Sequence, residues 1–381
     1  MADDMHLILI DGSGFIFRAF HALPPMTRAD GTPVNAVFGF TNMLARLLQN
    51  HEGTHIAVIF DAGRTTFRND MYAEYKANRS EPPPELVPQF ALVRDATAAF
   101  GVPGVELATW EADDLIASYA VAATKAGGRV TIVSSDKDLM QLVGDRVMMQ
   151  DPIKQKPIGP AEVMEKFGVL PAKVAEVQAL MGDSVDNVPG VPGIGPKTAA
   201  QLIQEFGDVE GVLAAAPAMK PGKRRDMLMQ HADAARISRK LVELCCEVPL
   251  PLTLEDLRAK EPQRDILVAW LRAQGFRSTV SRLGLDGAEP PKDTPLPDST
   301  TQPAFGPYEC VTSVERLQAW IDEATLAGVV GLDTEADTHD AMRANLVGFA
   351  LATAPGRACY VPLRHRAVQP AAQGTLDGPA Q

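Results

Sequence analysis

The sequence predicts an α/β fold with a mainly parallel central sheet and flanking helices. Apolar runs at 6–10, 55–60 and 129–133 are short and rich in Ile, Leu and Val, as expected of strands covered on both faces. Helical stretches at 35–49 and 113–126 lie between these runs, so strands and helices alternate along the chain. This alternation is typical of a parallel sheet with crossover helices.

The rest of the chain divides into further regions. Short apolar-periodic segments separated by Gly and Pro predict a helical subdomain over 176–285, after an α/β domain over 1–175. Residues 288–307 contain six prolines and no apolar period, which indicates a linker over 286–307. The last segment, 308–381, opens with paired strand-like runs and is expected to be a partial α/β domain.

Composition limits the class of protein. The 381 residues suffice for about two to three domains, and 46% apolar with 22% charged residues exclude wholesale disorder and collagen-like or coiled-coil structure. The chain has no apolar stretch of about 18 residues, and its first residues do not resemble a signal peptide, so we expect a cytoplasmic protein. Four cysteines without a CxxC spacing indicate neither a zinc site nor a disulfide framework.

The distribution of charge qualifies the overall acidity. A formal net charge of −12 argues against a partner as anionic as nucleic acid. Residues 220–240, however, contain seven Lys or Arg and only two Asp, and they include Lys223 and Arg224. Both a solvated helix face and a nucleic-acid surface fit this pattern.

Acidic residues follow each of the three predicted strands, at the edge of the sheet where open α/β folds bind ligands. Asp11 follows the first strand, Asp61 the second, and Asp136 and Asp138 the third. A single Asp after a strand is commonly a turn residue or a helix cap. Three strands that end alike favour a shared site.

Two more acidic groups extend this set. Glu111, Asp113 and Asp114 occupy the first turn of a predicted helix, where they could simply complement the helix dipole, and Asp183 and Asp186 are three residues apart. Carboxylates gathered in this number repel one another unless cations neutralise them, and oxygen-only ligands favour Mg²⁺ or Mn²⁺. We therefore predict a two-metal site for phosphodiester hydrolysis with the ligands Asp11, Asp61, Glu111, Asp113, Asp114, Asp136, Asp138, Asp183 and Asp186.

Two segments are candidates for contacting nucleic acid. The Gly-rich turn of Gly193, Ile194, Gly195, Lys197 and Thr198 opens a predicted helix and resembles a helix-hairpin-helix element, in which small residues and helix-terminal amides hold a phosphate. A helix cap is the simpler interpretation of such a turn.

The second segment, 64–79, combines cations with aromatic rings. Such a pattern suits unpaired strand ends, because bases stack on the rings while the cations hold phosphates. An amphipathic helix with its tyrosines in the core is the alternative. The candidates in this segment are Arg64, Arg68, Tyr75, Lys76 and Arg79.

Six stretches of the sequence carry specific motifs: LILIDGSGFIFRAFHALPP, VIFDAGRTTFRNDMYAEYKANR, WEADDLIAS, TIVSSDKDLMQLV, MGDSVDNVPGVPGIGPKTAAQLI and LDTEADTHDAMRANLVGFALA. Together they resemble the N-terminal part of bacterial DNA polymerase I, over about residues 5–365. Residues up to about 285 resemble its 5′-nuclease domain, of the flap endonuclease family with a PIN-like fold, and the remainder resembles the start of its 3′→5′ proofreading domain.

The resemblance implies a structure-specific 5′→3′ exonuclease and flap endonuclease in DNA replication and repair, monomeric and associated with the bacterial nucleoid. Its substrates would be DNA with 5′ flaps, nicks or 5′ ends and RNA–DNA primer junctions. The nine acids would hold two Mg²⁺ or Mn²⁺ ions, and residues 193–198 would bind downstream duplex, with one K⁺ on the turn. Lys76 and Arg79 would engage the scissile phosphate, and a base would stack on Tyr75.

The C-terminal segment matches its counterpart only in part. Asp333 and Glu335 correspond to the first two of the four acids of a proofreading site, and the other two do not appear in the sequence. We therefore expect neither proofreading nor polymerase activity from this chain.

Two other functions fit parts of the pattern. One is a DNA-binding module that recognises branched structures without cutting, and the other is a nuclease for structured RNA, which would not need a helix-hairpin-helix element.

For the main hypothesis, we expect Asp114, Asp183 and Asp186 to act partly through water. The acids nearest the metals would be Asp11, Asp61, Glu111, Asp113, Asp136 and Asp138.

Overall fold

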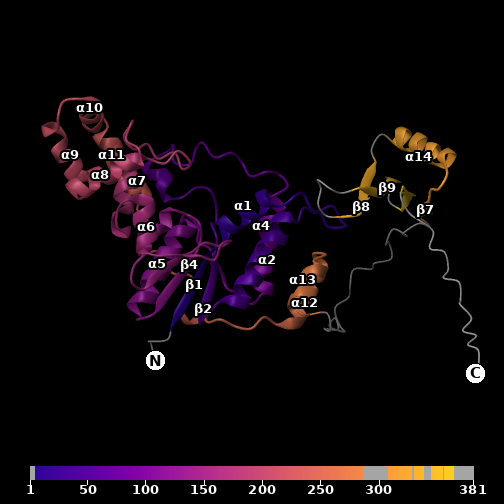
Figure 1. The fold of residues 1–381 in the computed structure, drawn as a ribbon. Coiled ribbons are helices and arrows are strands. Elements are labelled where there is room, and N and C mark those ends of the chain that lie inside the picture. Colours follow the sequence, from indigo (N-terminus) through magenta and orange to yellow (C-terminus); the bar gives the residue numbers. More distant parts are fainter. Residues whose placement is uncertain (1–4, 286–307, 328–329, 339–344, 355, 364–381) are drawn as a thin grey trace, which may run out of the picture. The chain divides into compact units, whose positions relative to one another are not determined.

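A computed structural model describes residues 5–285, 308–327, 330–338, 345–354 and 356–363. The chain forms two units, Met1–Pro291 and Lys292–Gln381 (Figure 1). The linker expected over 286–307 lies outside the described residues. The expected boundary at residue 175 falls inside the first unit and stays a prediction.

The first unit is built on a six-stranded sheet, as the α/β prediction requires. The strand order is β3-β2-β1-β4-β5-β6, and all neighbours are parallel except β5 and β6. Three strands match the apolar runs of the sequence, whereas β3, β5 and β6 were not predicted. The strands are β1 (His6–Asp11), β2 (His55–Ile59), β3 (Gly104–Val105), β4 (Arg129–Val133), β5 (Val147–Gln150) and β6 (Pro157–Ile158).

Helices cover both faces of this sheet, which explains why its central strands are apolar throughout. From β1, Ile8 and Ile10 pack on the face covered by α1, α2 and α4, while Leu7 and Leu9 pack on the face covered by α5 (Figure 1). The sheet is therefore the middle layer of three. The bounds of these helices are α1 (Gly12–Ala22), α2 (Asn35–Asn50), α4 (Val87–Ala99) and α5 (Ala112–Lys125).

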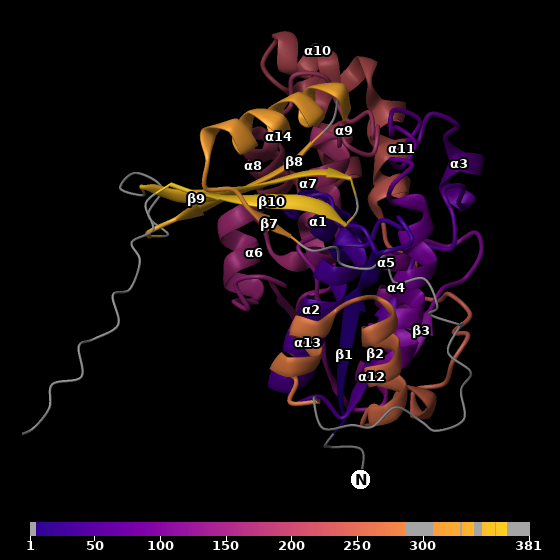
Figure 2. The same cartoon turned by 90° about the vertical axis from the view of Figure 1, so that its right-hand side faces the viewer.

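The predicted helical region is present, but its end returns to the sheet. Leu267 and Leu271 of α12 (Arg264–Ala273) and Val280 of α13 (Arg277–Arg282) belong to the core on the α2 side of the sheet (Figure 2). The remaining helical elements of this unit are α3 (Phe67–Met71), η1 (Asp138–Leu142), α6 (Pro160–Phe167), η2 (Pro171–Lys173), α7 (Val174–Met181), α8 (Pro196–Phe206), α9 (Val209–Ala215), η3 (Ala216–Ala218), α10 (Lys223–Gln230), α11 (Ala232–Val242) and η4 (Glu255–Leu257).

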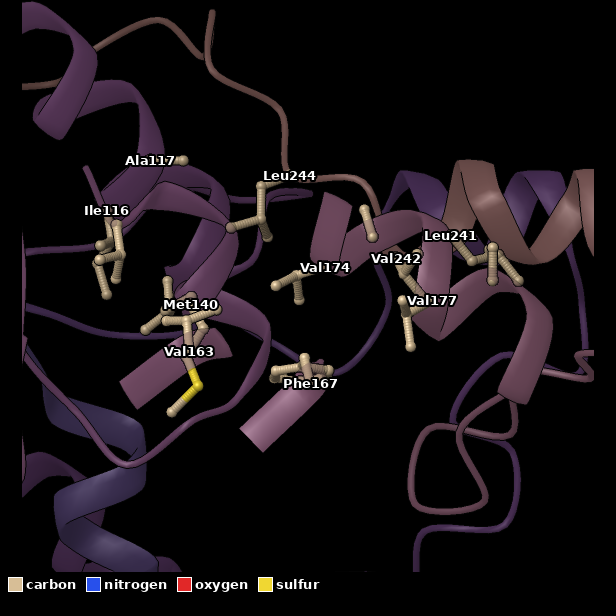
Figure 3. Close-up of a cluster of buried hydrophobic side chains, with 14 of the residues drawn as sticks. Ile116, Ala117, Met140, Val163, Phe167, Val174, Val177, Leu241, Val242 and Leu244 are labelled. Atoms are coloured by element: carbon tan, nitrogen blue, oxygen red, sulfur yellow. The ribbon is translucent and has the colours of Figure 1, made fainter. Parts of the chain in front are cut away.

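One hydrophobic core joins the helical region to the sheet. Ile116 of α5, Met140 of η1 and Phe167 of α6 belong to the same buried cluster as Val177 of α7 and Leu241 of α11 (Figure 3). Because these side chains exclude water together, the elements that carry them are fixed relative to one another. This core sets the position of α7 beside η1, the short helix that follows β4.

The second unit is a small sheet of order β7-β10-β9-β8 with one helix. Its strands β8 (Gly331–Ala336) and β9 (Leu346–Ala354) pair antiparallel, which confirms the predicted pairing of these runs. Trp320 of α14 (Val314–Ala327) packs with Val311, Cys359 and Val361 in its core. The other strands are β7 (Glu309–Cys310) and β10 (Arg357–Pro362).

None of the helices in the described residues is long and apolar enough to cross a membrane.

Candidate active site

Hydrogen bonds tie together the ends of β1 and β4. Asp11 ends β1, and its Oδ1 accepts from the Gly14 N–H at 2.8 Å, which caps α1. Its Oδ2 accepts from the Ser134 hydroxyl at 2.8 Å, just after β4. The same hydroxyl accepts from the Asp136 N–H at 2.9 Å. Asp11 and Asp136 are therefore placed by one serine.

Asp138 lies two residues further on, at the start of η1. Its N–H donates to Oδ1 of Asp136 at 2.9 Å, and its carboxylate accepts from the Nε2 of Gln178, which α7 supplies. Its carbonyl accepts from the Gln141 amide at 2.8 Å. Both the backbone and the side chain of Asp138 are thus held.

Asp61 connects the end of β2 with the start of α5. Its N–H donates to the Ser13 hydroxyl at 3.1 Å, and its Oδ1 accepts from the Ala112 N–H at 2.8 Å. Because Ala112 begins α5, this bond fixes the helix whose first turn carries Asp113. The three strand ends and this helix meet at the carboxyl edge of the sheet.

The electrostatics show that five of the nine predicted acids lie close together. Burial, and then the charges of Asp61 and Asp136, raise the pKa of Asp11 to about 6. Burial and Asp136 raise the pKa of Asp138 to about 7. The pKa of Asp113 is also well above its ordinary value, through burial and the charges of the other four acids. These mutual shifts identify one carboxylate cluster.

The four remaining acids have cationic partners, although Asp183 also raises the pKa of Asp138. Glu111 accepts from Lys76 Nζ at 2.9 Å and from the Tyr75 hydroxyl at 3.2 Å. Burial opposes its charge, but Lys76 and Arg68 outweigh burial and hold the pKa of Glu111 below its ordinary value. Asp183 pairs with Lys137 at 2.5 Å.

Asp186 pairs with Lys76 and Arg79, the two cations that the resemblance places at the scissile phosphate. Its carboxylate contacts the Arg79 guanidinium and lies 3.8 Å from Lys76 Nζ. Its carbonyl accepts from the Lys76 N–H at 3.0 Å. Lys76 and Arg79 are therefore positioned beside the cluster through Asp186 and Glu111.

Two predicted residues have structural roles. Asp114 is fully buried and accepts two hydrogen bonds from Arg68, at 2.6 and 2.8 Å, and one from the Cys245 N–H at 2.9 Å. Arg68 is only 2% exposed and also donates to two carbonyls. In this structure Asp114 and Arg68 are each other's partners, and their predicted roles as a metal ligand and a DNA contact stay predictions.

Tyr75 is largely buried beside the cluster. It is 5% exposed, its hydroxyl donates to Glu111, and Lys76 Nζ lies 5.0 Å from its ring centroid. Its ring belongs to the hydrophobic core cluster. The segment is not the amphipathic helix of the alternative interpretation, because α3 ends at Met71, and stacking of a base on Tyr75 stays a prediction.

A cavity of about 680 Å³ opens beside the cluster. It lies between α1, the loop after β2 and the segment that follows α3. Arg64, whose Nη2 donates to the carbonyl of Arg79 at 2.8 Å, contributes a half-exposed cation. The residues that line this cavity and that the sequence singled out are Asp61, Arg64, Tyr75, Lys76, Arg79 and Glu111.

The Gly-rich turn before α8 is exposed except for one anchor. Gly193 has a φ of +82°, and no atom lies within 4 Å of where a Cβ would stand on it or on Gly195. Ile194 is buried and its N–H donates to the carbonyl of Val191 at 3.1 Å, while Lys197 is exposed and Thr198 half-buried. The turn therefore offers backbone groups and one lysine to solvent.

The remaining predicted residues are on the surface. Lys223 and Arg224 are exposed at the start of α10, beside a hollow of about 620 Å³ that Lys220 and Arg225 also line. In the second unit, Asp333 and Glu335 are exposed on one face of β8, two residues apart.

Sequence reasoning missed three residues of the site: Ser134, Lys137 and Gln178. Ser134 and Lys137 lie within the SSDKD stretch that carries two of the acids. Their positions next to these predicted ligands could have identified them. Gln178 lies forty residues from the carboxylate it contacts, within an ordinary helical pattern. Nothing in the sequence distinguishes it.

The donors in the cluster suit a hard cation, since they are all carboxylate oxygens. No group of three Asp, Glu, His or Cys side chains is arranged to hold one ion among the residues that the structure describes. The chemistry of the five gathered acids nevertheless fits divalent cations.

Comparisons with known proteins agree with this geometry. Two family models match the chain: the 5′-3′ exonuclease N-terminal resolvase-like domain over residues 6–168, and the 5′-3′ exonuclease C-terminal SAM fold over 169–265. A 5′-3′ exonuclease of Aquifex aeolicus is 36% identical over 73% of this chain and 94% of its own length.

A DNA polymerase I of Rhizobium leguminosarum is 43% identical over 95% of this chain but only 43% of its own length. The chain thus spans less than half of such relatives. A bacteriophage T5 flap endonuclease, solved as a pseudo-enzyme-product complex with DNA and metal ions, has a TM-score of 0.54 at 22% identity, over 74% of this chain and 98% of its own. That likeness supports the same fold.

Proposed function

The chain belongs to the 5′-3′ exonuclease family, and on that premise we propose that its gathered carboxylates serve the metal-dependent hydrolysis of DNA phosphodiesters at 5′ flaps, nicks and 5′ ends. The matched regions are those of the nuclease part of DNA polymerase I. Removal of RNA primers at RNA–DNA junctions, and a place in replication and repair as part of a longer polymerase, belong to the same proposal.

One observation carries the metal requirement. None of the five gathered acids forms an ion pair with Lys or Arg in the described part of the chain, whereas Glu111, Asp114, Asp183 and Asp186 each have such a partner. A cluster of carboxylates without ion-pair partners is unfavourable. Bound divalent cations would relieve this repulsion, so the cluster is best explained as a cation site for Asp11, Asp61, Asp113, Asp136 and Asp138.

Two bound Mg²⁺ or Mn²⁺ ions would activate the attacking water and stabilise the charge on the phosphate. The residues of this chain place the substrate. Lys76 and Arg79 border the cavity beside the cluster, where they would hold the scissile phosphate in exchange for their carboxylate partners. Arg64 would guide the same strand.

The duplex would be held farther away, without reading its bases. Exposed amides of the turn at Gly193 and Gly195, together with Lys197, suit a phosphate backbone, with one K⁺ on the turn carbonyls. Lys223 and Arg224 would extend this contact along the duplex. The protein would act as a monomer in association with the nucleoid.

The decisive experiment is cleavage of a 5′-labelled flap on a nicked duplex by the purified chain, with Mg²⁺ and with EDTA. Cutting near the junction only with Mg²⁺ supports the proposal. Asp113→Asn should abolish it, and the exposed Asp95→Asn, on α4, should not. Tight binding without cutting under every metal would instead favour a module that only binds branched DNA.

A further inference from the structure

Gln178 is a fully buried polar residue of α7, and its side-chain Nε2 donates to Oδ1 of Asp138. We propose that Gln178 is a positioning residue that orients the Asp138 carboxylate toward the cation site. This inference rests on the proposed function, because it assigns a role within the same site. It adds a residue from the helical region to a cluster otherwise built from strand ends and the start of α5.

The orientation of the amide is determined by its partner. With a cation bound, as we propose, the Asp138 carboxylate is ionised and can only accept, so the glutamine presents its NH₂ group to Asp138. Its Oε1 is then buried, and it has no hydrogen-bond partner in the part of the chain that the structure describes. A side chain needed only for packing would not require an amide here, because a buried unsatisfied carbonyl is unfavourable. The contact with Asp138 accounts for the amide.

The surrounding core keeps the amide in place. Val174 and Val177, on the same helix, are fully buried, and Met140 of η1 lies in the same cluster (Figure 3). The backbone of Asp138 is held independently by Gln141 and Asp136. With both ends fixed, the hydrogen bond restricts the rotation of the carboxylate.

Partners of this kind usually affect metal affinity by about 10- to 100-fold. Gln178→Met keeps the length and helix preference of the side chain and removes only the donor. We expect Mn²⁺ binding, followed by the electron paramagnetic resonance signal of the free ion, to weaken about 10-fold. The KM for flap DNA should stay unchanged, and kcat should recover at high metal concentration.

Gln89→Met is the matched control. Gln89 is also fully buried, on α4, but its Nε2 donates to Asn35 at 2.9 Å and not to an acid of the cluster. Both variants should lower the melting temperature, and only Gln178→Met should shift the Mn²⁺ titration. An unshifted titration for Gln178→Met, or equal shifts for both variants, would overturn the inference. A parent protein that neither binds Mn²⁺ nor cuts would instead contradict the proposed function.

Discussion

Arg68 and Asp114 form a buried two-pronged ion pair, with guanidinium nitrogens 2.6 and 2.8 Å from the two carboxylate oxygens. Arg68 also donates to the carbonyls of Leu241 and Glu243, at 2.8 and 2.9 Å. The pair therefore connects α3 and α5 with the end of α11 and the segment that follows it. It holds the part of the 64–79 segment around Arg68 next to the carboxylate cluster.

Arg68→Met should destabilise the protein strongly, because it leaves Asp114 as an uncompensated buried charge. Removing one partner of such a pair costs about 3–5 kcal/mol. Urea unfolding in EDTA would measure the loss, and the double variant Arg68→Met/Asp114→Leu should recover part of it. Arg236→Met, which breaks an exposed pair with Glu210, is the control and should leave the midpoint unchanged. Weaker DNA binding at unchanged stability would make Arg68 a phosphate contact after all.

Asp138→Asn should stabilise the metal-free protein at alkaline pH. Burial and Asp136 raise the pKa of Asp138 to about 7, whereas an unfolded Asp titrates near about 4. The folded state thus binds an extra proton between these values, and the associated stability is lost as the pH rises through about 7. The asparagine in the variant does not ionise. The stability of the variant should therefore exceed that of the parent by a large amount near about pH 8 and by a small amount near about pH 5.

Thermal unfolding of both proteins in EDTA across this range would test the difference. The buried histidines titrate identically in the two proteins and cancel. A parent that is more stable than Asp138→Asn at the alkaline end would contradict the assigned shift. In Mg²⁺ the parent should be more stable than Asp138→Asn, because only the parent retains the full charge that binds the ion.

Local patterns in the sequence predicted one part of the site. Uninterrupted apolar runs identify buried parallel strands, and parallel strands bring their carboxyl ends together, so Asp11, Asp61 and Asp136 could be grouped by their positions in the chain. The burial of Arg68 and Tyr75 was not predicted, because it depends on contacts far along the chain. Arg68 contacts Leu241, and no local sequence pattern indicates a contact between residues so far apart in the chain. Gln178 was missed for the same reason.

Lys197→Met should weaken DNA binding equally for all sequences. Its exposed ammonium, in the first turn of α8, suits a phosphate, and losing one phosphate contact should reduce the slope of log affinity against log salt by about one. Fluorescence anisotropy with a flap duplex at several salt concentrations would show this. Lys260→Met is the control. The N–H of the neighbouring Ala259 donates to the carbonyl of Thr54, just before β2, at the end of the strands opposite to the carboxylate cluster. An unchanged slope for Lys197→Met would contradict the prediction that this turn contacts DNA.

Arg79→Met should reduce cleavage far more than binding. The Arg79 side chain is 47% exposed, borders the cavity beside the cluster and pairs with Asp186, so it can exchange this carboxylate for a scissile phosphate. Losing one charge that acts in the transition state typically lowers kcat about 100- to 1,000-fold. Single-turnover cleavage of the labelled flap, with binding measured in Ca²⁺, separates the two effects. Arg258→Met, which breaks an exposed pair with Glu255, should leave both unchanged. If Arg79→Met lowered affinity and the cleavage rate of bound flap stayed at the parent value, Arg79 would be a binding residue only.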